Sequence, residues 1–158
     1  MEMRRKDLAV TEPERIDKII MSCQHFRLAF ADGTHPYIIP LNFGYEREGD
    51  VRKFYFHGAS EGRKVDLSRK LKYAGFELDT GTLLKPEDKA CDFSMAYQSV
   101  VGEGTIEELV TKEEKAKGLR VMMKHYSGRA DWEFPDKVLD ATCVFCLSVT
   151  QISAREHG

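Results

Sequence analysis

Tight-turn residues between short apolar segments constrain the fold of this chain more than any other feature of its sequence. Asp32-Gly33 ends a predicted strand over residues 25–31, and Glu48-Gly49-Asp50 joins predicted strands over 37–45 and 51–57. Asp-Gly pairs favour the two-residue turns of β-hairpins, and links this short connect only antiparallel strands. The first half of the chain therefore predicts an antiparallel meander of three strands.

The second half of the chain supplies three more predicted strands, over residues 72–78, 97–109 and 142–152. The strand over 97–109 contains Gly102 and Gly104, and glycine inside a strand indicates a bulge or the close approach of another group. Six mostly antiparallel strands with two or three helices predict an α+β, mostly β protein. We expect its sheet to curl into a barrel with peripheral helices.

Two helices are predicted from capping boxes, in which a Thr side chain and a Glu three residues later satisfy the free N–H groups of a first turn. Thr11 with Glu14 predicts the first helix. Thr111 with Glu114 predicts a longer helix that reaches about Tyr126. Both helices carry apolar residues at helical spacing, so each is expected to pack one face on the sheet.

The length and charge of the chain limit its class. Its 158 residues fit one domain over 1–158, and the net charge of −2 lacks the basic excess that non-specific nucleic-acid binding needs. No apolar run reaches the roughly 20 residues of a membrane span. The charged residues 1–6 are followed by no apolar signal segment, and the four cysteines are scattered. We therefore expect a cytoplasmic protein with no nucleic-acid or membrane partner.

The strongest candidate binding motif follows the third predicted strand. Small residues at 58–60 end that strand, and Arg63 and Lys64 lie in the first turn of a predicted helix over 61–69 that Ser60 would cap. Small residues admit a ligand to the backbone, a helix N-terminus offers free N–H groups, and two cations add positive charge. The segment therefore predicts a monophosphate site. The alternative is a solvated basic pair, which surface statistics favour when spacing alone is considered.

His57 ends the apolar strand beside this motif, and it has two interpretations. It is either a strand-end residue hydrogen-bonded to backbone or a polar wall of the ligand pocket, because imidazole titrates near neutral pH. No HExxH motif occurs, so the histidines predict no zinc protease site.

Cys143 and Cys146 have CxxC spacing within a predicted strand. Residues three apart on a strand face opposite sides, so these two sulfurs are not expected to share a metal ion. A zinc site that also uses Cys23 and Cys91 is the less favoured alternative, and we predict buried structural thiols and no metal.

The sequence resembles the pyridoxamine 5′-phosphate oxidase-like, FMN-binding split-barrel proteins, and within them the branch similar to 5-nitroimidazole resistance proteins. The resemblance covers nearly the whole chain from Met3 to the last strand. The matching segments are Arg27-Leu28-Ala29, residues 36–45, residues 55–59 with Gly62-Arg63-Lys64, Cys91-Asp92, residues 97–100 with Gly102, and His125-Tyr126 with Trp132.

This resemblance implies a six-stranded split barrel that dimerises with two FMN molecules in the interface. It implies that the isoalloxazine ring and ribityl chain are lined by Pro40, Leu41, Asn42, Phe56, His57, Gly58 and Ala59. It assigns the flavin phosphate to Arg63 and Lys64, in agreement with the residue-level interpretation. Ser99 would reach the flavin from the partner subunit, and Trp132 would close the pocket.

The function that the resemblance implies is an FMN-dependent oxidoreductase acting on small electron-poor aromatic compounds. His57 is the residue predicted to lie beside the substrate as a polar or acid–base group. Two alternatives remain at this point: a flavin-binding carrier or sensor without turnover, and a haem-binding split barrel, which would need an axial ligand such as histidine. The sequence contains no evident cluster for a substrate phosphate, so pyridoxamine phosphate oxidation is not assigned.

Overall fold

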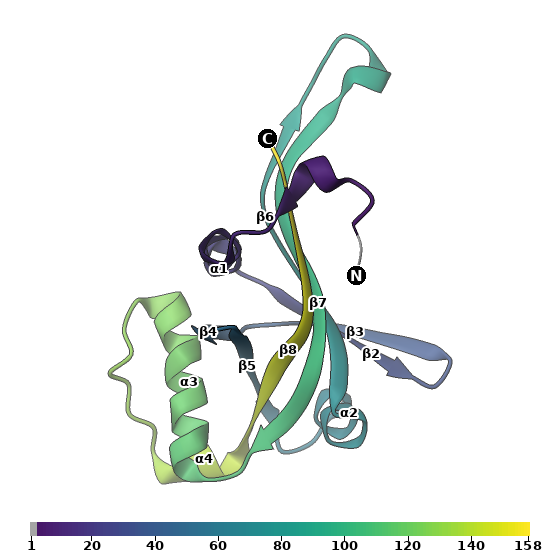
Figure 1. The fold of residues 1–158 in the computed structure, drawn as a ribbon. Coiled ribbons are helices and arrows are strands. Elements are labelled where there is room, and N and C mark those ends of the chain that lie inside the picture. The colour runs from purple at the N-terminus through teal and green to yellow at the C-terminus, as the bar shows by residue number, and fades with distance from the viewer. Residues whose placement is uncertain (1–2) are drawn as a thin grey trace.

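The computed structural model describes residues 3–158 as one antiparallel sheet surrounded by helices (Figure 1). Met1 and Glu2, the first residues of the predicted domain 1–158, lie outside the described residues. The strands are β1 (Ala9–Val10), β2 (Phe26–Asp32), β3 (His35–Leu41), β4 (Gly44–Glu48), β5 (Val51–Ala59), β6 (Tyr73–Lys85), β7 (Ser94–Leu109) and β8 (Thr142–His157). The helices are α1 (Pro13–Ser22), α2 (Arg63–Leu71), α3 (Lys112–Ser127) and α4 (Asp136–Ala141), with short 3-10 turns at Lys6–Leu8 and Ala90–Asp92.

The sheet closes on itself as a split barrel. Its strand order is β3-β2-β6-β7-β8-β5-β4, and β1 pairs with β8. β3 and β4 lie at opposite ends of this order, yet only Asn42 and Phe43 connect them. A link of two residues spans at most about 11 Å, so the two ends of the sheet must approach each other. The predicted fold class is therefore confirmed. The sheet has eight strands against the six expected, because β1 is added and residues 37–45 form two strands.

The predicted meander is wrong at its centre. The β2–β3 and β4–β5 hairpins form as expected, but β3 and β4 are not paired with each other. Phe43 breaks the expected strand, because its ring is fully buried against Phe26 and Phe54. Gly44 follows at a point where a Cβ would lie 2.6 Å from the backbone nitrogen of Met122, so α3 approaches the sheet here too closely for a side chain.

Two of the three predicted helix caps are wrong. α1 begins after Glu12 rather than Thr11, and no side chain caps it. α2 begins after Gly62 rather than Ser60, and no side chain caps it either. Gly62 has φ +136°, a conformation that favours glycine, so the chain turns into the helix only at this residue. The capping box of Thr111 and Glu114 at α3 is confirmed, with both reciprocal hydrogen bonds present.

The core has two parts, one on each face of β5 and β8. Phe54 and Phe56 of β5 pack inside the barrel, whereas Tyr55 between them packs under α3. In β8, Cys143 likewise faces the barrel interior and Cys146 faces α3. This alternation follows from the two-residue period of a strand. It confirms that the two cysteines lie on opposite faces and are buried, with free thiols.

β6 and β7 form a long twisted hairpin that projects past the rest of the barrel (Figure 1). The pairing of β7 with β8 shifts register between Glu103 and Gly104, which confirms the predicted bulge. A Cβ on Gly102 would collide with the Gln151 carbonyl oxygen and the Phe76 ring, so close approach explains this glycine. Among residues 3–158, no helix has the length and apolar character needed to cross a bilayer.

Candidate functional site

The end of β5 and the start of α2 form a corner whose backbone donors are open. β5 pairs with β8 as far as Ala59, and the chain then turns through Gly62 into α2. The N–H groups of the first helical turn have no partner within a helix, and here no side chain caps them. Because the helix dipole places partial positive charge at this end, the corner favours an anion.

Lys64 is held against the end of β5. Its Nζ donates a hydrogen bond to the His57 carbonyl oxygen at 2.9 Å. The lysine stem passes Gly58, where a Cβ would lie 2.9 Å from Lys64 Cε, so glycine provides the space for this side chain. Partial burial lowers the pKa of Lys64 from its ordinary value. An ammonium has three N–H donors, so two remain for a ligand.

Arg63 projects toward the β2–β3 hairpin. Its guanidinium lies 4.3 Å from the centre of the Tyr37 ring, and Nη2 donates to Asp32 Oδ2 at 3.2 Å. The sequence marked Asp32 only as a turn residue and gave no sign that either residue reaches Arg63, because the contact depends on the barrel's closure. The Arg63 side chain is 52% exposed, and exposed ion pairs stabilise a protein by about 0–1 kcal/mol. A phosphate could therefore compete for this guanidinium.

His57 lies at the same corner with its side chain exposed. Desolvation by the surrounding protein, and to a lesser extent the Lys64 charge, lower the pKa of His57 from its ordinary value of 6.5. The imidazole is therefore neutral at pH 7, and it can both donate and accept a hydrogen bond.

Other predicted flavin-lining residues lie near this corner or along β3. Phe56 is fully buried and stacks on Phe145 with ring centres 5.3 Å apart, so it offers a ligand no exposed surface in a single chain. Pro40 and Asn42 are exposed, and Leu41 between them is half-buried. They lie three to five residues along the chain from Tyr37, or about 10–17 Å at strand spacing.

Ser99 and Trp132 are not brought to the corner within one chain. Ser99 pairs with Asp79, and Asp79 accepts a hydrogen bond from Arg27 near the start of β2. Arg63 contacts Asp32 at the other end of β2, so Ser99 and Arg63 lie near opposite ends of this strand. Trp132 lies beyond α3, where its Nε1 donates to Ser127 Oγ at 3.1 Å.

The donor set of the corner fits a phosphate. Arg63 presents a planar fork with most of its donors free, Lys64 adds a point charge, and the first turn of α2 adds backbone N–H groups. Arg63 and His57 are both exposed, so the corner is an open surface in a single chain.

No group of three or more His, Cys, Asp or Glu side chains within residues 3–158 is placed to hold a metal ion. The buried thiols have other surroundings. Burial raises the pKa of Cys23 to about 12, and Cys143 Sγ lies 3.3 Å from Arg69 Nη2.

Solved structures share this fold over nearly the whole chain. A protein from Bacteroides thetaiotaomicron assigned as a 5-nitroimidazole antibiotic resistance protein is 25% identical, with a TM-score of 0.81 over 94% of this chain and 86% of that one. The flavocytochrome Anf3 from Azotobacter vinelandii is 22% identical, with a TM-score of 0.81 over 99% of this chain and 72% of that one. An FAD- and heme-binding protein from Mycobacterium smegmatis is 21% identical, with a TM-score of 0.77 over 95% of this chain and 74% of that one.

No curated protein matches the chain in sequence. The sequence profile of the family described as pyridoxamine 5′-phosphate oxidase does match, over residues 12–156. That range begins one residue before α1 and ends one residue before the end of β8, so it includes the barrel and the corner of Arg63 and Lys64. The chain therefore belongs to the pyridoxamine 5′-phosphate oxidase family of split-barrel proteins.

Proposed function

We propose that this protein binds FMN and uses it in an oxidoreductase reaction on small electron-poor aromatic compounds. The observation that supports it most is the open corner, where Arg63, Lys64 and the uncapped first turn of α2 converge with their donors available. Because the chain belongs to the pyridoxamine 5′-phosphate oxidase family, we expect the phosphate that fits this corner to be that of a flavin.

The relatives support the same class of cofactor. Two of the three relatives reported above are a flavocytochrome and an FAD- and heme-binding protein. The nitroimidazole resistance relative supports a nitroaromatic or similarly electron-poor substrate. FMN is proposed over FAD because the corner offers donors for one terminal phosphate.

The residues of the corner would divide the work. Arg63 and Lys64 would hold the phosphate, and Gly58 would leave the space that the Lys64 side chain needs to reach it, because that position carries no side chain. When bound, FMN supplies the hydride or electron transfer, and the protein supplies its placement. His57, neutral at pH 7, would offer a hydrogen bond to the ligand or its substrate.

We propose that the working unit is a homodimer with FMN at its interface. Ser99 and Trp132 lie away from Arg63 in one chain, so they could contribute to the same site only from a second copy. An exposed surface suits such a partner: Ile38 is 64% exposed beside a cavity of about 450 Å³ over β2, β6 and β7. In a symmetric dimer the same patch is used by both subunits.

The test is a titration of FMN, riboflavin and FAD into the wild-type protein and an Arg63→Ala, Lys64→Ala double variant. We expect FMN to bind tighter than riboflavin by at least about tenfold, because a charge-assisted hydrogen bond contributes roughly 1.5–3 kcal/mol. The double variant should lose this difference while its riboflavin affinity stays the same. Lys70→Ala, at the other end of α2, is the control for removal of a cation.

Three outcomes would contradict the proposal. Equal affinity for FMN and riboflavin in the wild type would exclude a phosphate site at this corner. Tighter binding of FAD than of FMN would make FAD the cofactor, and an intense Soret band in the purified protein would make haem the cofactor. If FMN binds as expected, a screen of nitroaromatic acceptors with a nicotinamide donor tests turnover, and His57→Ala should lower turnover more than FMN affinity.

A further inference from the structure

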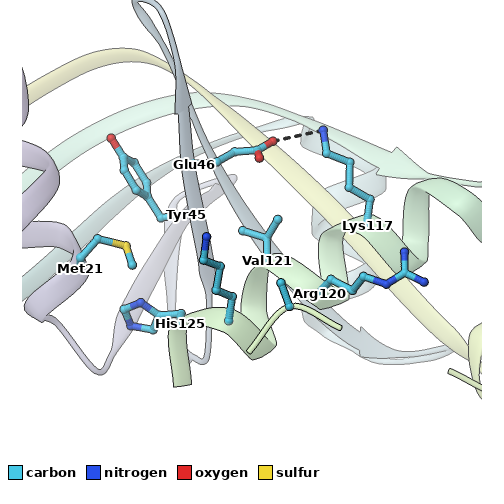
Figure 2. A pocket seen from close by; sticks show the side chains of 9 residues that line it. Met21, Tyr45, Glu46, Lys117, Arg120, Val121 and His125 are labelled. Atoms are coloured by element: carbon cyan, nitrogen blue, oxygen red, sulfur yellow. Dashed lines mark ion pairs between the residues drawn. The ribbon is translucent and has the colours of Figure 1, made fainter. Parts of the chain in front are cut away.

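A cavity separate from the Arg63 corner lies between the end of α1, β4 and α3. Its volume is about 340 Å³, within the range of small-ligand pockets. Figure 2 shows Met21, Tyr45 and His125 on one side of it, with Lys117 and Arg120 on the other and Val121 between them. The lining residues are Met21, Tyr45, Glu46, Lys117, Arg120, Val121, Lys124, His125 and Ala130.

Three cations of α3 face this cavity. Lys117, Arg120 and Lys124 are three and four residues apart, so they lie along one face of the helix. Glu46 is the one carboxylate among the nine lining residues. It is already engaged, because it accepts a hydrogen bond from the Tyr55 hydroxyl at 2.5 Å and pairs with Lys117 at 3.3 Å. The wall therefore has an excess of positive charge.

Arg120 is held in place while its outer donors stay open. Its Nε donates to the Trp132 carbonyl oxygen at 2.9 Å, and its terminal amino groups make no hydrogen bond within residues 3–158. Arginine presents those terminal groups in a plane that matches a carboxylate. Fixing one edge of the guanidinium reduces the entropy that binding would remove from the side chain.

Apart from His125, the remaining walls are apolar. Val121 and Ala130 line the cavity, and the exposed thioether of Met21 lies at its edge. Tyr45 contributes its ring, because its hydroxyl is directed away to Asp17 Oδ1 at 2.5 Å. A small inorganic anion would leave these apolar surfaces exposed to water, whereas a ligand with an apolar body would bury them.

We propose that this cavity binds a small carboxylate with an apolar or aromatic body. The carboxylate contacts Arg120 and Lys124, and the body packs on Met21, Val121 and the Tyr45 ring. This site shares no lining residue with the Arg63 corner, so the proposal stands whether or not the protein binds flavin. A ligand on Arg120 would also contact a side chain that holds the backbone of Trp132, which places the site next to a predicted flavin-pocket residue.

The test uses benzoate as the probe and benzamide as its neutral analogue, followed by calorimetry or ligand-detected NMR. We expect benzoate to bind with a dissociation constant of about 1 mM or tighter, as a ligand of this size allows, and benzamide to bind at least about tenfold more weakly. The Arg63→Ala, Lys64→Ala variant should bind benzoate as the wild type does. That result separates this site from the proposed phosphate site.

Variants at the cavity sharpen the test. Arg120→Gln should weaken benzoate by about tenfold or more, whereas Arg129→Gln should not change it. Arg129 is the matched control because it stacks on Trp132 at 4.3 Å but does not line the cavity. At Met21, which is 45% exposed, Met21→Glu should weaken benzoate and Met21→Lys should not, and both variants should fold.

Several results would overturn the proposal. The first is the absence of benzoate binding up to 10 mM, which is about ten times the expected dissociation constant. The second is equal affinity for benzoate and benzamide. The third is an equal loss of benzoate affinity in the two Met21 variants. Loss of benzoate binding in the Arg63→Ala, Lys64→Ala variant would place the anion at the corner instead.

Discussion

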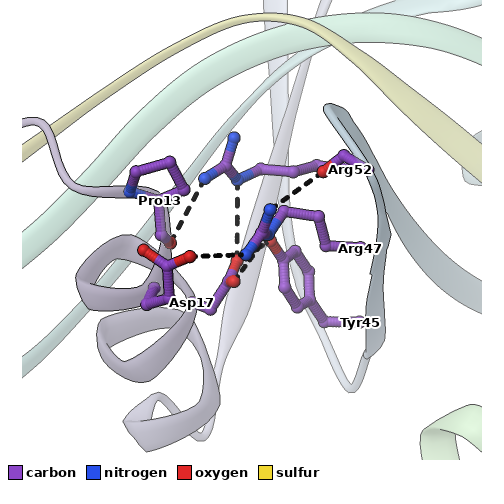
Figure 3. Close-up of polar contacts among 7 residues, drawn as sticks. Pro13, Asp17, Tyr45, Arg47 and Arg52 are labelled. Carbon is purple, nitrogen blue, oxygen red and sulfur yellow. Dashed lines mark hydrogen bonds and ion pairs between the residues drawn. The ribbon is translucent and has the colours of Figure 1, made fainter.

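Two clusters of basic residues on this protein differ in what their donors contact. At one, Arg47 and Arg52 of the β4–β5 hairpin surround Asp17 of α1 (Figure 3). At the other, Arg63 and Lys64 lie at the corner of α2. The first cluster is largely buried, with the Arg52 side chain 11% exposed, whereas the Arg63 side chain is 52% exposed. Charge alone therefore does not mark a binding site, and the partners of each cation decide it.

The Asp17 cluster directs its donors inward. Arg47 donates to Asp17 Oδ2 at 2.6 Å and to the Gly49 carbonyl oxygen at 2.9 Å. The Tyr45 hydroxyl donates to Asp17 Oδ1, and burial together with this hydrogen bond raises the pKa of Tyr45. The cluster ties α1 to the β4–β5 hairpin, so we assign it to stability.

The largest effect is expected from Asp17→Asn. The substitution leaves two largely buried arginines without their carboxylate, and removing one partner of a buried ion pair costs about 3–5 kcal/mol. Because Asp17 is 24% exposed, we expect a loss of about 2–3 kcal/mol in the free energy of unfolding. Urea unfolding measures it, and the FMN affinity of the folded protein should not change. A change below about 0.5 kcal/mol would remove the structural role of the cluster.

Gly58→Ala is expected to have the next largest effect, at the corner. A new Cβ would lie 2.9 Å from Lys64 Cε and 3.2 Å from Val65 Cγ2, so Lys64 must move away from the end of β5. We expect about a tenfold loss of FMN affinity and a loss of about 1 kcal/mol in stability. In a double-mutant cycle with Lys64→Ala, the two losses of affinity should not add, because both act through the same side chain. Additive losses would mean that Gly58 acts independently of Lys64.

These two clusters also show which parts of the fold and of the candidate site can be predicted from the sequence. Apolar periodicity and turn residues identified most of the strands and the basic pair, because those features are local. The single central strand over 37–45 was predicted wrongly, because the chain divides at Phe43 and Gly44, which pack against α3, and α3 is remote in sequence. The contacts of Arg63 with Asp32 and Tyr37 depend on the same closure. The Asp17 cluster was missed for that reason too, since its residues come from elements that look unrelated in sequence.

Asp32→Asn should change FMN affinity less than Gly58→Ala does, and in the opposite direction. The change removes the carboxylate that holds Arg63 at 3.2 Å, and an exposed pair of this kind contributes at most about 1 kcal/mol to stability. FMN affinity should rise by about two- to fivefold at low salt, because a charge that repels phosphate is lost, and less at high salt. Asp50→Asn, at the distant β4–β5 turn, is the control for net charge. A fall in affinity would show instead that Asp32 positions Arg63 for binding.

The smallest effect is a shift in the titration of His57. Desolvation and the Lys64 charge lower the pKa of His57 in the folded protein below its ordinary value of 6.5. At a pH between the folded pKa and 6.5, the unfolded chain therefore binds more protons than the folded protein does. The stability that His57 contributes is therefore present above pH 6.5 and is lost as the pH falls through the folded pKa. A bound phosphate adds negative charge beside the ring and favours its protonated form, so FMN should raise the pKa of His57. NMR of the imidazole across pH 5–8, with and without FMN, measures the change, and riboflavin should produce little of it. If riboflavin raised the pKa as much as FMN does, the phosphate would lie elsewhere, and the corner of Arg63 and Lys64 would be a solvated basic pair.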